Sequence, residues 1–258
     1  MKRTFFLFAI LLTHLPVFAG EPVFFVQITD THFGLQEHAD RARAAVKTIN
    51  ALPVKIAFVA VTGDIMHDCI MDSNVVSEAL TIFSGLKAPV HYVPGNHDLL
   101  KKSPEETVAV FTNRFGPLIS SAEYGGVEFV FVCTEPLSNG IKIQGYDPVS
   151  SLDKLLQAHA GQPAVIFNHA PSVDDFYGNS SHSGWGDSKE GLRWTELLNR
   201  YPVKAVIAGH FHRDELHWVG NIPLYAGPPL SSWLGRQAAF RVYEYHDGKL
   251  GYRTYYLP

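Results

Sequence analysis

The chain has 258 residues, of which 46% are hydrophobic and 18% charged, and its formal net charge is −4. This length suits one sizeable α/β domain with a full core. The negative balance disfavours polymeric nucleic acid or an anionic membrane as the main partner, because both are bound chiefly through basic surface.

The first 19 residues have the pattern of a cleavable leader. Lys2 and Arg3 make a basic start, Phe5–Leu12 is apolar, and Val17-Phe18-Ala19 offers small residues for cleavage before Gly20. This is typical of a secretory signal peptide, and the apolar stretch is shorter than the ~20 residues that span a bilayer. We expect residues 1–19 to be removed. The remaining domain, residues 20–258, would be secreted or periplasmic without stable membrane association, and its 19 basic residues would face 25 acidic ones.

Short apolar runs rich in β-branched and aromatic residues alternate with helical patterns along the rest of the chain. The predicted strands are Val23–Ile28, Ile56–Val61, Val90–Val93, Ala164–Phe167 and Val203–Ala208. The predicted helices are Glu37–Asn50, Asp72–Leu86, Ser103–Arg114, Ser151–His159 and Lys189–Arg200. Near the end, Phe240–Tyr245 and Leu250–Tyr256 around Asp247-Gly248 predict a β-hairpin. The alternation indicates a single α/β domain.

A polar cluster follows each of the predicted strands. In chain order the clusters are Asp30-Thr31-His32, Gly63-Asp64, Gly95-Asn96-His97-Asp98, Asn168-His169 and Gly209-His210-Phe211-His212. In α/β folds ligands collect beyond the carboxyl ends of the strands, so these side chains should meet on one surface. On extended backbone, residues i and i+2 point the same way, which would let Asp30 and His32, or His210 and His212, reach one ion together.

The donor types in these clusters favour a metal site over separate structural roles. Carboxylate oxygen, imidazole nitrogen and amide oxygen suit zinc, manganese and iron. A lone buried histidine is more often a core residue held by hydrogen bonds, but five clusters in this order indicate a hydrolytic site for two metals.

At these residues the sequence resembles the calcineurin-like metallophosphoesterase family, whose pattern runs D-x-H, G-D, G-N-H-D, H and G-H-x-H. The resemblance implies two packed mixed β-sheets flanked by helices, a four-layer α/β/β/α sandwich. It implies two transition-metal ions (Fe, Mn or Zn), with a first metal held by Asp30, His32 and His212, a second by Asn96, His169 and His210, and Asp64 bridging both. By the same resemblance, His97 faces the substrate just outside the coordination sphere, and Asp98 orients it.

The second cluster departs from two branches of that family. The stretch Gly63–Cys69 reads GDIMHDC, without the arginine that grips phosphate in the protein serine/threonine phosphatases. His67 stands where the purple acid phosphatases have a tyrosine ligand, and its role is left open.

The implied chemistry follows from charge. Paired divalent ions attract a phosphate ester, ionise bound water near neutral pH and clamp oxygens for in-line attack by a bridging hydroxide. The leaving oxygen needs a proton, and His97 is the candidate donor. The alternative for His97 is a structural histidine beside the site.

The stretch Ser172–Ser188 is the candidate for substrate specificity, because it is long, polar and follows His169. Its Tyr177 and Trp185 are candidates to stack on the organic part of the substrate; the alternative is an ordinary exposed loop. Cys69 and Cys133 are the only cysteines, and we do not predict that they pair.

Together these features favour an exported metal-dependent hydrolase of small organic phosphate mono- or diesters. Nucleotides are among the candidate substrates. A protein serine/threonine phosphatase is the alternative within the family. From another class, a catalytically silent metal- or ligand-binding protein of the same fold is possible, although an intact ligand set together with His97 argues against it.

Overall fold

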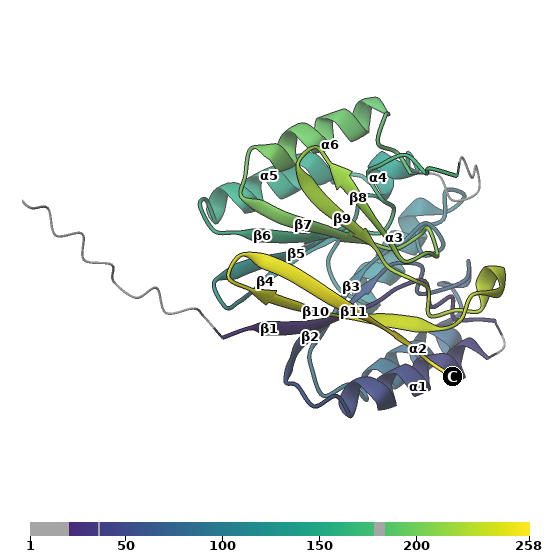
Figure 1. Ribbon diagram of the computed structural model, residues 1–258. Helices are drawn as coiled ribbons and strands as arrows, with labels where there is room; N and C mark the ends of the chain where they lie inside the picture. Colours follow the sequence, from purple (N-terminus) through teal and green to yellow (C-terminus); the bar gives the residue numbers. More distant parts are fainter. Residues whose placement is uncertain (1–20, 36, 178–183) are drawn as a thin grey trace, which may run out of the picture.

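The computed structural model describes residues 21–35, 37–177 and 184–258, which fold around two β-sheets packed face to face (Figure 1). The expected leader, residues 1–19, lies outside the described residues, as do positions 178–183 of the polar stretch after His169. Within the part of the chain that the structure describes, no helix is long and apolar enough to cross a bilayer.

One sheet has five strands in the order β11-β10-β1-β2-β3. Strands β1, β2 and β3 run parallel, whereas β10 pairs antiparallel with both β1 and β11. The bounds are β1 Val23–Ile28, β2 Ile56–Thr62, β3 Val90–Val93, β10 Ala239–His246 and β11 Lys249–Tyr256. The parallel strands therefore end at one common edge.

The other sheet has six strands in the order β4-β5-β6-β7-β9-β8. The four inner strands are parallel, and the edge strands β4 and β8 are antiparallel to their neighbours. The bounds are β4 Ile119–Tyr124, β5 Val127–Val132, β6 Ala164–Phe167, β7 Val203–Ala208, β8 Glu215–Val219 and β9 Ile222–Ala226.

Helices cover the outer face of each sheet (Figure 1). Buried residues of α1 (His38–Asn50), α2 (Ser73–Phe83) and α3 (Pro104–Arg114) share one core with the first sheet. Those of the short α4 (Glu135–Ser138), α5 (Pro148–Ala158) and α6 (Lys189–Asn199) share a second core with the other sheet. This arrangement confirms the predicted α/β class with two mixed sheets flanked by helices.

Aromatic side chains fill the space between the sheets. Phe25 stacks between Phe58 and Tyr243 of its own sheet, with ring centroids 5.0 and 5.1 Å away. It also meets Phe129 and Phe167 of the opposite sheet edge-on, at 5.2 and 5.8 Å. Burying a side chain of this size stabilises a fold by about 1.5–3 kcal/mol. This packing fixes the two sheets relative to each other and hence the strand ends that carry the polar clusters.

A buried polar network also crosses between the sheets near those strand ends. The Gln27 side-chain amide donates to the Thr62 hydroxyl at 2.9 Å and to the Ala208 carbonyl at 2.7 Å. The Tyr243 hydroxyl donates to the Gln27 amide oxygen at 3.0 Å, and Arg241 donates to Tyr243 at 3.0 Å. Since Ala208 ends β7, the network anchors the residue directly before the Gly209–His212 cluster.

The sequence pattern located most of these elements. Four of the five predicted strands have the observed bounds, β2 is one residue longer, and the helix ends differ by no more than three residues. The β8–β9 hairpin was not predicted, because it lacks a long apolar run. Both cysteines are free: Cys133 is buried, and the Cys69 thiol donates to the Phe33 carbonyl.

Candidate metal centre

Two groups of metal-competent side chains form where the polar clusters meet. The first joins Asp30, His32, Asp64 and His212, all buried, with one donor atom from each lying within 4.8 Å of the others. His212 Nε2 is 3.2 Å from Asp30 Oδ1 and 3.3 Å from His32 Nε2. His32 Nε2 is 3.8 Å from Asp64 Oδ2. Four donor atoms this close together are suited to one cation.

The second group joins Asp64, His169 and His210, which are also buried. His169 Nε2 lies 3.1 Å from Asp64 Oδ2 and 3.2 Å from the amide oxygen of Asn96. His169 Nδ1 lies 2.9 Å from the Thr62 carbonyl, which can only accept, so Nδ1 carries a proton. Asp64 raises the pKa of His169, so Nε2 offers a lone pair to a metal once it has lost its proton. Asp64 belongs to both groups, as the bridging role requires.

The charges of the two carboxylates suit this site. Burial opposes ionisation of Asp64 and Asp30, but neighbouring histidines outweigh burial and lower the pKa of both carboxyls, His169 for Asp64 and His212 for Asp30. Burial lowers the pKa of His32 to about 3 against the opposing charge of Asp64, so that imidazole is neutral. Ionised carboxylates beside a neutral imidazole are the forms that coordinate metal.

The backbone of the clusters is strained. The φ angle is 52° at Asp30, 47° at His32, 48° at Asp64, 67° at His210 and 53° at His212. This left-handed region costs a non-glycine residue about 1–2 kcal/mol, and such strain concentrates at functional sites. The expectation of extended backbone is therefore wrong. Asp30 and His32 do reach one group, but through a left-handed turn, while His210 and His212 reach different groups.

Glycine is required where the second and third clusters approach His169. A Cβ on Gly95 would lie 2.3 Å from Asp64 Oδ1 and 2.8 Å from the His169 ring. A Cβ on Gly63, whose φ is 88°, would lie 2.4 Å from His169 Nδ1. Any larger residue would displace the ligands themselves.

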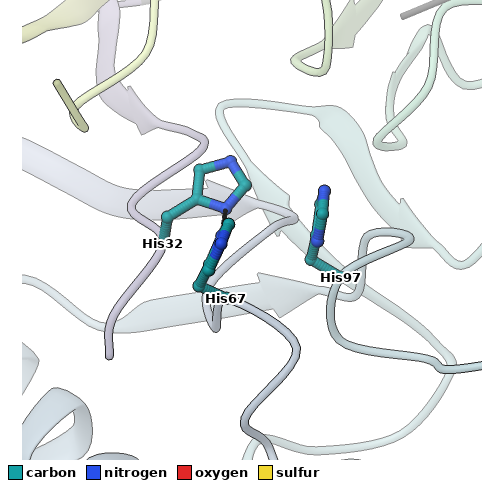
Figure 2. A group of neighbouring side chains, drawn as sticks. All are labelled: His32, His67 and His97. Atoms are coloured by element: carbon teal, nitrogen blue, oxygen red, sulfur yellow. Dashed lines mark hydrogen bonds between the residues drawn. The ribbon is translucent and has the colours of Figure 1, made fainter. Parts of the chain in front are cut away.

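A third group, His32, His67 and His97, flanks the first (Figure 2). His67 Nδ1 lies 3.2 Å from His32 Nδ1, and the rings of His67 and His97 stack with centroids 5.3 Å apart. His67 therefore contacts His32 through the nitrogen that points away from the four-residue group. This bond fixes the ring orientation of His32, which is the role that sequence reasoning left open.

His97 is held at the edge of the site by an aspartate that the motif pattern did not single out. Its Nδ1 lies 2.9 Å from Asp68 Oδ1, and its side chain is 26% exposed. Burial alone would lower the pKa of His97, but the charges of Asp64 and Asp68 outweigh it and raise the pKa. The His97 amide also donates to Asp64 Oδ1 at 2.9 Å. Only the spacing of four residues from Asp64 could have drawn attention to Asp68.

Asp98 has a different role from the one expected. Its carboxylate accepts hydrogen bonds from the backbone amides of Gly95, Ile65 and Met66 at 2.8–3.1 Å and is fully buried. It therefore joins the second and third clusters and positions Asp64 and His97 through their loops. The side-chain partner that orients His97 directly is Asp68.

The two aromatic candidates in the polar stretch after His169 differ in the structure. Trp185 is 5% exposed, its indole N–H donates to the Ala170 carbonyl, and it packs near Trp194 in the core beneath α6. The prediction that Trp185 stacks on substrate is therefore wrong, because its ring is used for packing. Tyr177 is 68% exposed, and its role remains a prediction.

Arg213, directly after His212, attaches the start of this stretch to the metal centre. Its guanidinium lies 4.8 Å from the centre of the Tyr177 ring and pairs with Asp175 at 2.6 Å and Glu215 at 2.5 Å. The contact places Tyr177 beside Arg213, one residue after the last cluster. No motif in the sequence marks this link, since it depends on the fold.

Comparison with known proteins agrees with this geometry. A family model described as calcineurin-like phosphoesterase matches residues 25–214. A Rhodopseudomonas palustris protein named probable cyclic nucleotide phosphodiesterase RPA0124 is 40% identical, over 84% of this chain and 80% of its own. The mouse protein named serine/threonine-protein phosphatase CPPED1 is 27% identical, over 92% of this chain and 84% of its own.

Solved structures share the fold. A dimetal phosphatase from Danio rerio superposes with a TM-score of 0.61 at 15% identity, over 90% of this chain and 98% of its own. The purple acid phosphatase PPD1 from yellow lupin gives 0.63 at 13% identity, over 91% of this chain and 52% of its own. The solved structures show only the fold, whereas the sequence matches show the family. The chain belongs to the calcineurin-like phosphoesterase family, whose members are hydrolases acting on phosphoester bonds.

Proposed function

We propose that the protein binds two transition-metal ions and hydrolyses small organic phosphate mono- or diesters. The observation that carries this proposal is the single Asp64 carboxylate shared by two buried groups of histidine and aspartate donors. When bound, two such ions activate water as the nucleophile and neutralise the phosphoryl oxygens. Iron, manganese and zinc all suit this donor set.

The remaining roles belong to side chains around those groups. His97, held through Nδ1 by Asp68, donates a proton from Nε2 to the leaving oxygen of the ester. Asp98 and the His97 amide hold the Asp64 loop, so that the shared carboxylate and the proton donor keep a fixed distance from each other. Such prepositioning is what an in-line displacement needs.

Two features support a small ester over a phosphoprotein as substrate. The relative with 40% identity is named a probable cyclic nucleotide phosphodiesterase. The arginine that grips phosphate in the protein phosphatases is absent from the stretch Gly63–Cys69. The name of the mouse relative keeps a protein phosphatase as the second candidate.

The direct test is hydrolysis of a panel of phosphate mono- and diesters, cyclic nucleotides and a phosphopeptide, with metals quantified in the same sample. We expect about two transition-metal ions per chain and turnover of small esters well above that of the phosphopeptide. Bound metal without turnover of any ester would favour the silent binding protein. Preferential turnover of the phosphopeptide would favour the protein phosphatase.

We also propose that the protein is exported, on the basis of the basic, apolar and small-residue segments of its first 19 residues. Residues 1–25 fused to a reporter should carry it across the membrane, with cleavage after Ala19. Mass spectrometry of the exported reporter measures the cleavage point. An intact leader on a membrane-bound reporter would support an anchor instead, and a Lys2→Glu, Arg3→Glu leader provides the control that should export poorly.

A further inference from the structure

The segment 230–235 lies across the first cluster and is attached to it through the backbone. The Leu230 amide donates to the Thr29 carbonyl at 2.9 Å, and the Ser231 amide donates to the Asp30 carbonyl at 3.0 Å. Both acceptors belong to the loop that presents Asp30 to the metal centre. These two hydrogen bonds hold the start of the segment against this loop.

His38, the first residue of α1, connects the segment to the loop from the other side. Its Nδ1 lies 2.7 Å from the His32 carbonyl, and its Nε2 lies 3.0 Å from the Ser232 hydroxyl. Because a carbonyl only accepts, Nδ1 is the protonated nitrogen and Nε2 accepts from Ser232. His38 is buried, so this connection is protected from water.

These attachments place Trp233 beside the candidate metal centre. The centre of its ring system is 4.2 Å from that of His67, 5.3 Å from that of His32 and 6.0 Å from that of His97. Trp233 is partly exposed, and the next residue, Leu234, holds a strained φ of 59°. The Trp233 ring is held by its contacts with these three histidine rings.

We propose that Trp233 forms a binding subsite for a planar aromatic ring in the organic part of the substrate. This inference rests on the proposed esterase function and specifies its substrate class. An indole is a large, rigid apolar surface, and stacking of an aromatic ring on it is worth roughly 0.5–1.5 kcal/mol beyond the area buried, or about 2- to 12-fold in affinity. Its place beside His97, the proton donor, puts the subsite on the side of the leaving group.

The alternative is that Trp233 only shields His32 and His67 from water. A shield affects every substrate alike, because it acts on the metal centre. A stacking surface affects only esters that carry an aromatic ring, and it acts mainly on KM, since stacking is equal in the ground and transition states. The two roles therefore differ in which constant changes and for which substrate.

The test compares Trp233→Leu and Trp233→Phe on three esters: phenyl phosphate, a nucleoside 5′-phosphate, and a fluoroalkyl phosphate whose leaving group has acidity comparable to phenol. For the Leu variant we expect KM for the phenyl and nucleoside esters to rise roughly 5- to 10-fold, with little change for the fluoroalkyl ester. The Phe variant keeps a stacking surface and should retain most of the preference. Trp218→Leu, at a 60% exposed position on β8, should change nothing. If KM rises for only one of the two aromatic esters, that ester identifies the ring that the subsite binds.

Binding of phenylphosphonate and propylphosphonate, measured by calorimetry on the metal-loaded protein, separates this inference from the proposed function. A preference for phenylphosphonate that is lost in Trp233→Leu supports the subsite even if no ester is turned over, in which case the hydrolase proposal fails alone. Equal losses on all three esters, or no loss on any, would overturn the subsite while leaving hydrolysis intact. Metal content and thermal unfolding of each variant show whether the centre is still formed.

Discussion

Replacing Asp64 with alanine should remove most of the bound metal and lower turnover by more than about 100-fold. Changing a residue that only orients a metal ligand costs up to about 100-fold in metal affinity or activity, and losing a ligand itself should cost more. Asp64 supplies the only carboxylate common to both donor groups, with Oδ2 3.1 Å from His169 Nε2 and 3.8 Å from His32 Nε2. Without it, the first group would keep one carboxylate, Asp30, and the second would keep no anionic ligand. Metal analysis and ester turnover on the same preparation measure the effect.

Two further variants make this result interpretable. Asp64→Asn keeps the shape of the side chain and its contact with the His97 amide, so it tests metal affinity if the alanine variant folds poorly. Asp40→Ala, at an 81% exposed position on α1, should leave metal content and turnover unchanged. Retention of two ions by both Asp64 variants would show that Asp64 is not the shared ligand.

The fold was largely predictable because its buried strands are short apolar runs bounded by polar clusters. Such runs give a clear signal wherever both faces of a strand are covered, as for β6 and β7. The β8 edge strand has five residues, in which half-buried Glu215 and His217 alternate with exposed Leu216 and Trp218 before the buried Val219. So short a pattern does not distinguish a strand from a loop.

The site was predictable to the extent that its residues occur in local motifs. The clusters converge as expected, but Asp68 and Trp233 have no motif of their own, and their positions depend on the loops that carry them. For Trp185 the local sequence was misleading. Its place in a polar stretch suggested an exposed ring, but the indole N–H donates to the buried carbonyl of Ala170. Local sequence identifies the donors, whereas tertiary contacts decide which neighbours orient them.

The His97→Ala variant should lose roughly 10²–10⁴-fold in turnover, the usual range for general acid catalysis, while keeping its metals. Alanine retains the backbone N–H that donates to Asp64, so the shared ligand stays in place. The loss should be largest for esters with basic alkoxide leaving groups and smaller for nitrophenyl esters, whose phenolate departs without a proton. Kinetics on matched alkyl and nitrophenyl esters measure this difference.

Asp68→Asn separates a proton donor from a structural histidine. The charges of Asp64 and Asp68 raise the pKa of His97, so removing the second charge should lower that pKa. An acid must be protonated to act, and the alkaline limb of the kcat profile should therefore move to lower pH. Metal content should not change, because Asp68 belongs to neither donor group that contains Asp64.

His169→Ala and His210→Ala should instead lose metal and activity on every ester alike. If His97→Ala loses its metals, or slows alkyl and nitrophenyl esters equally, His97 is structural, since only a proton donor discriminates between leaving groups.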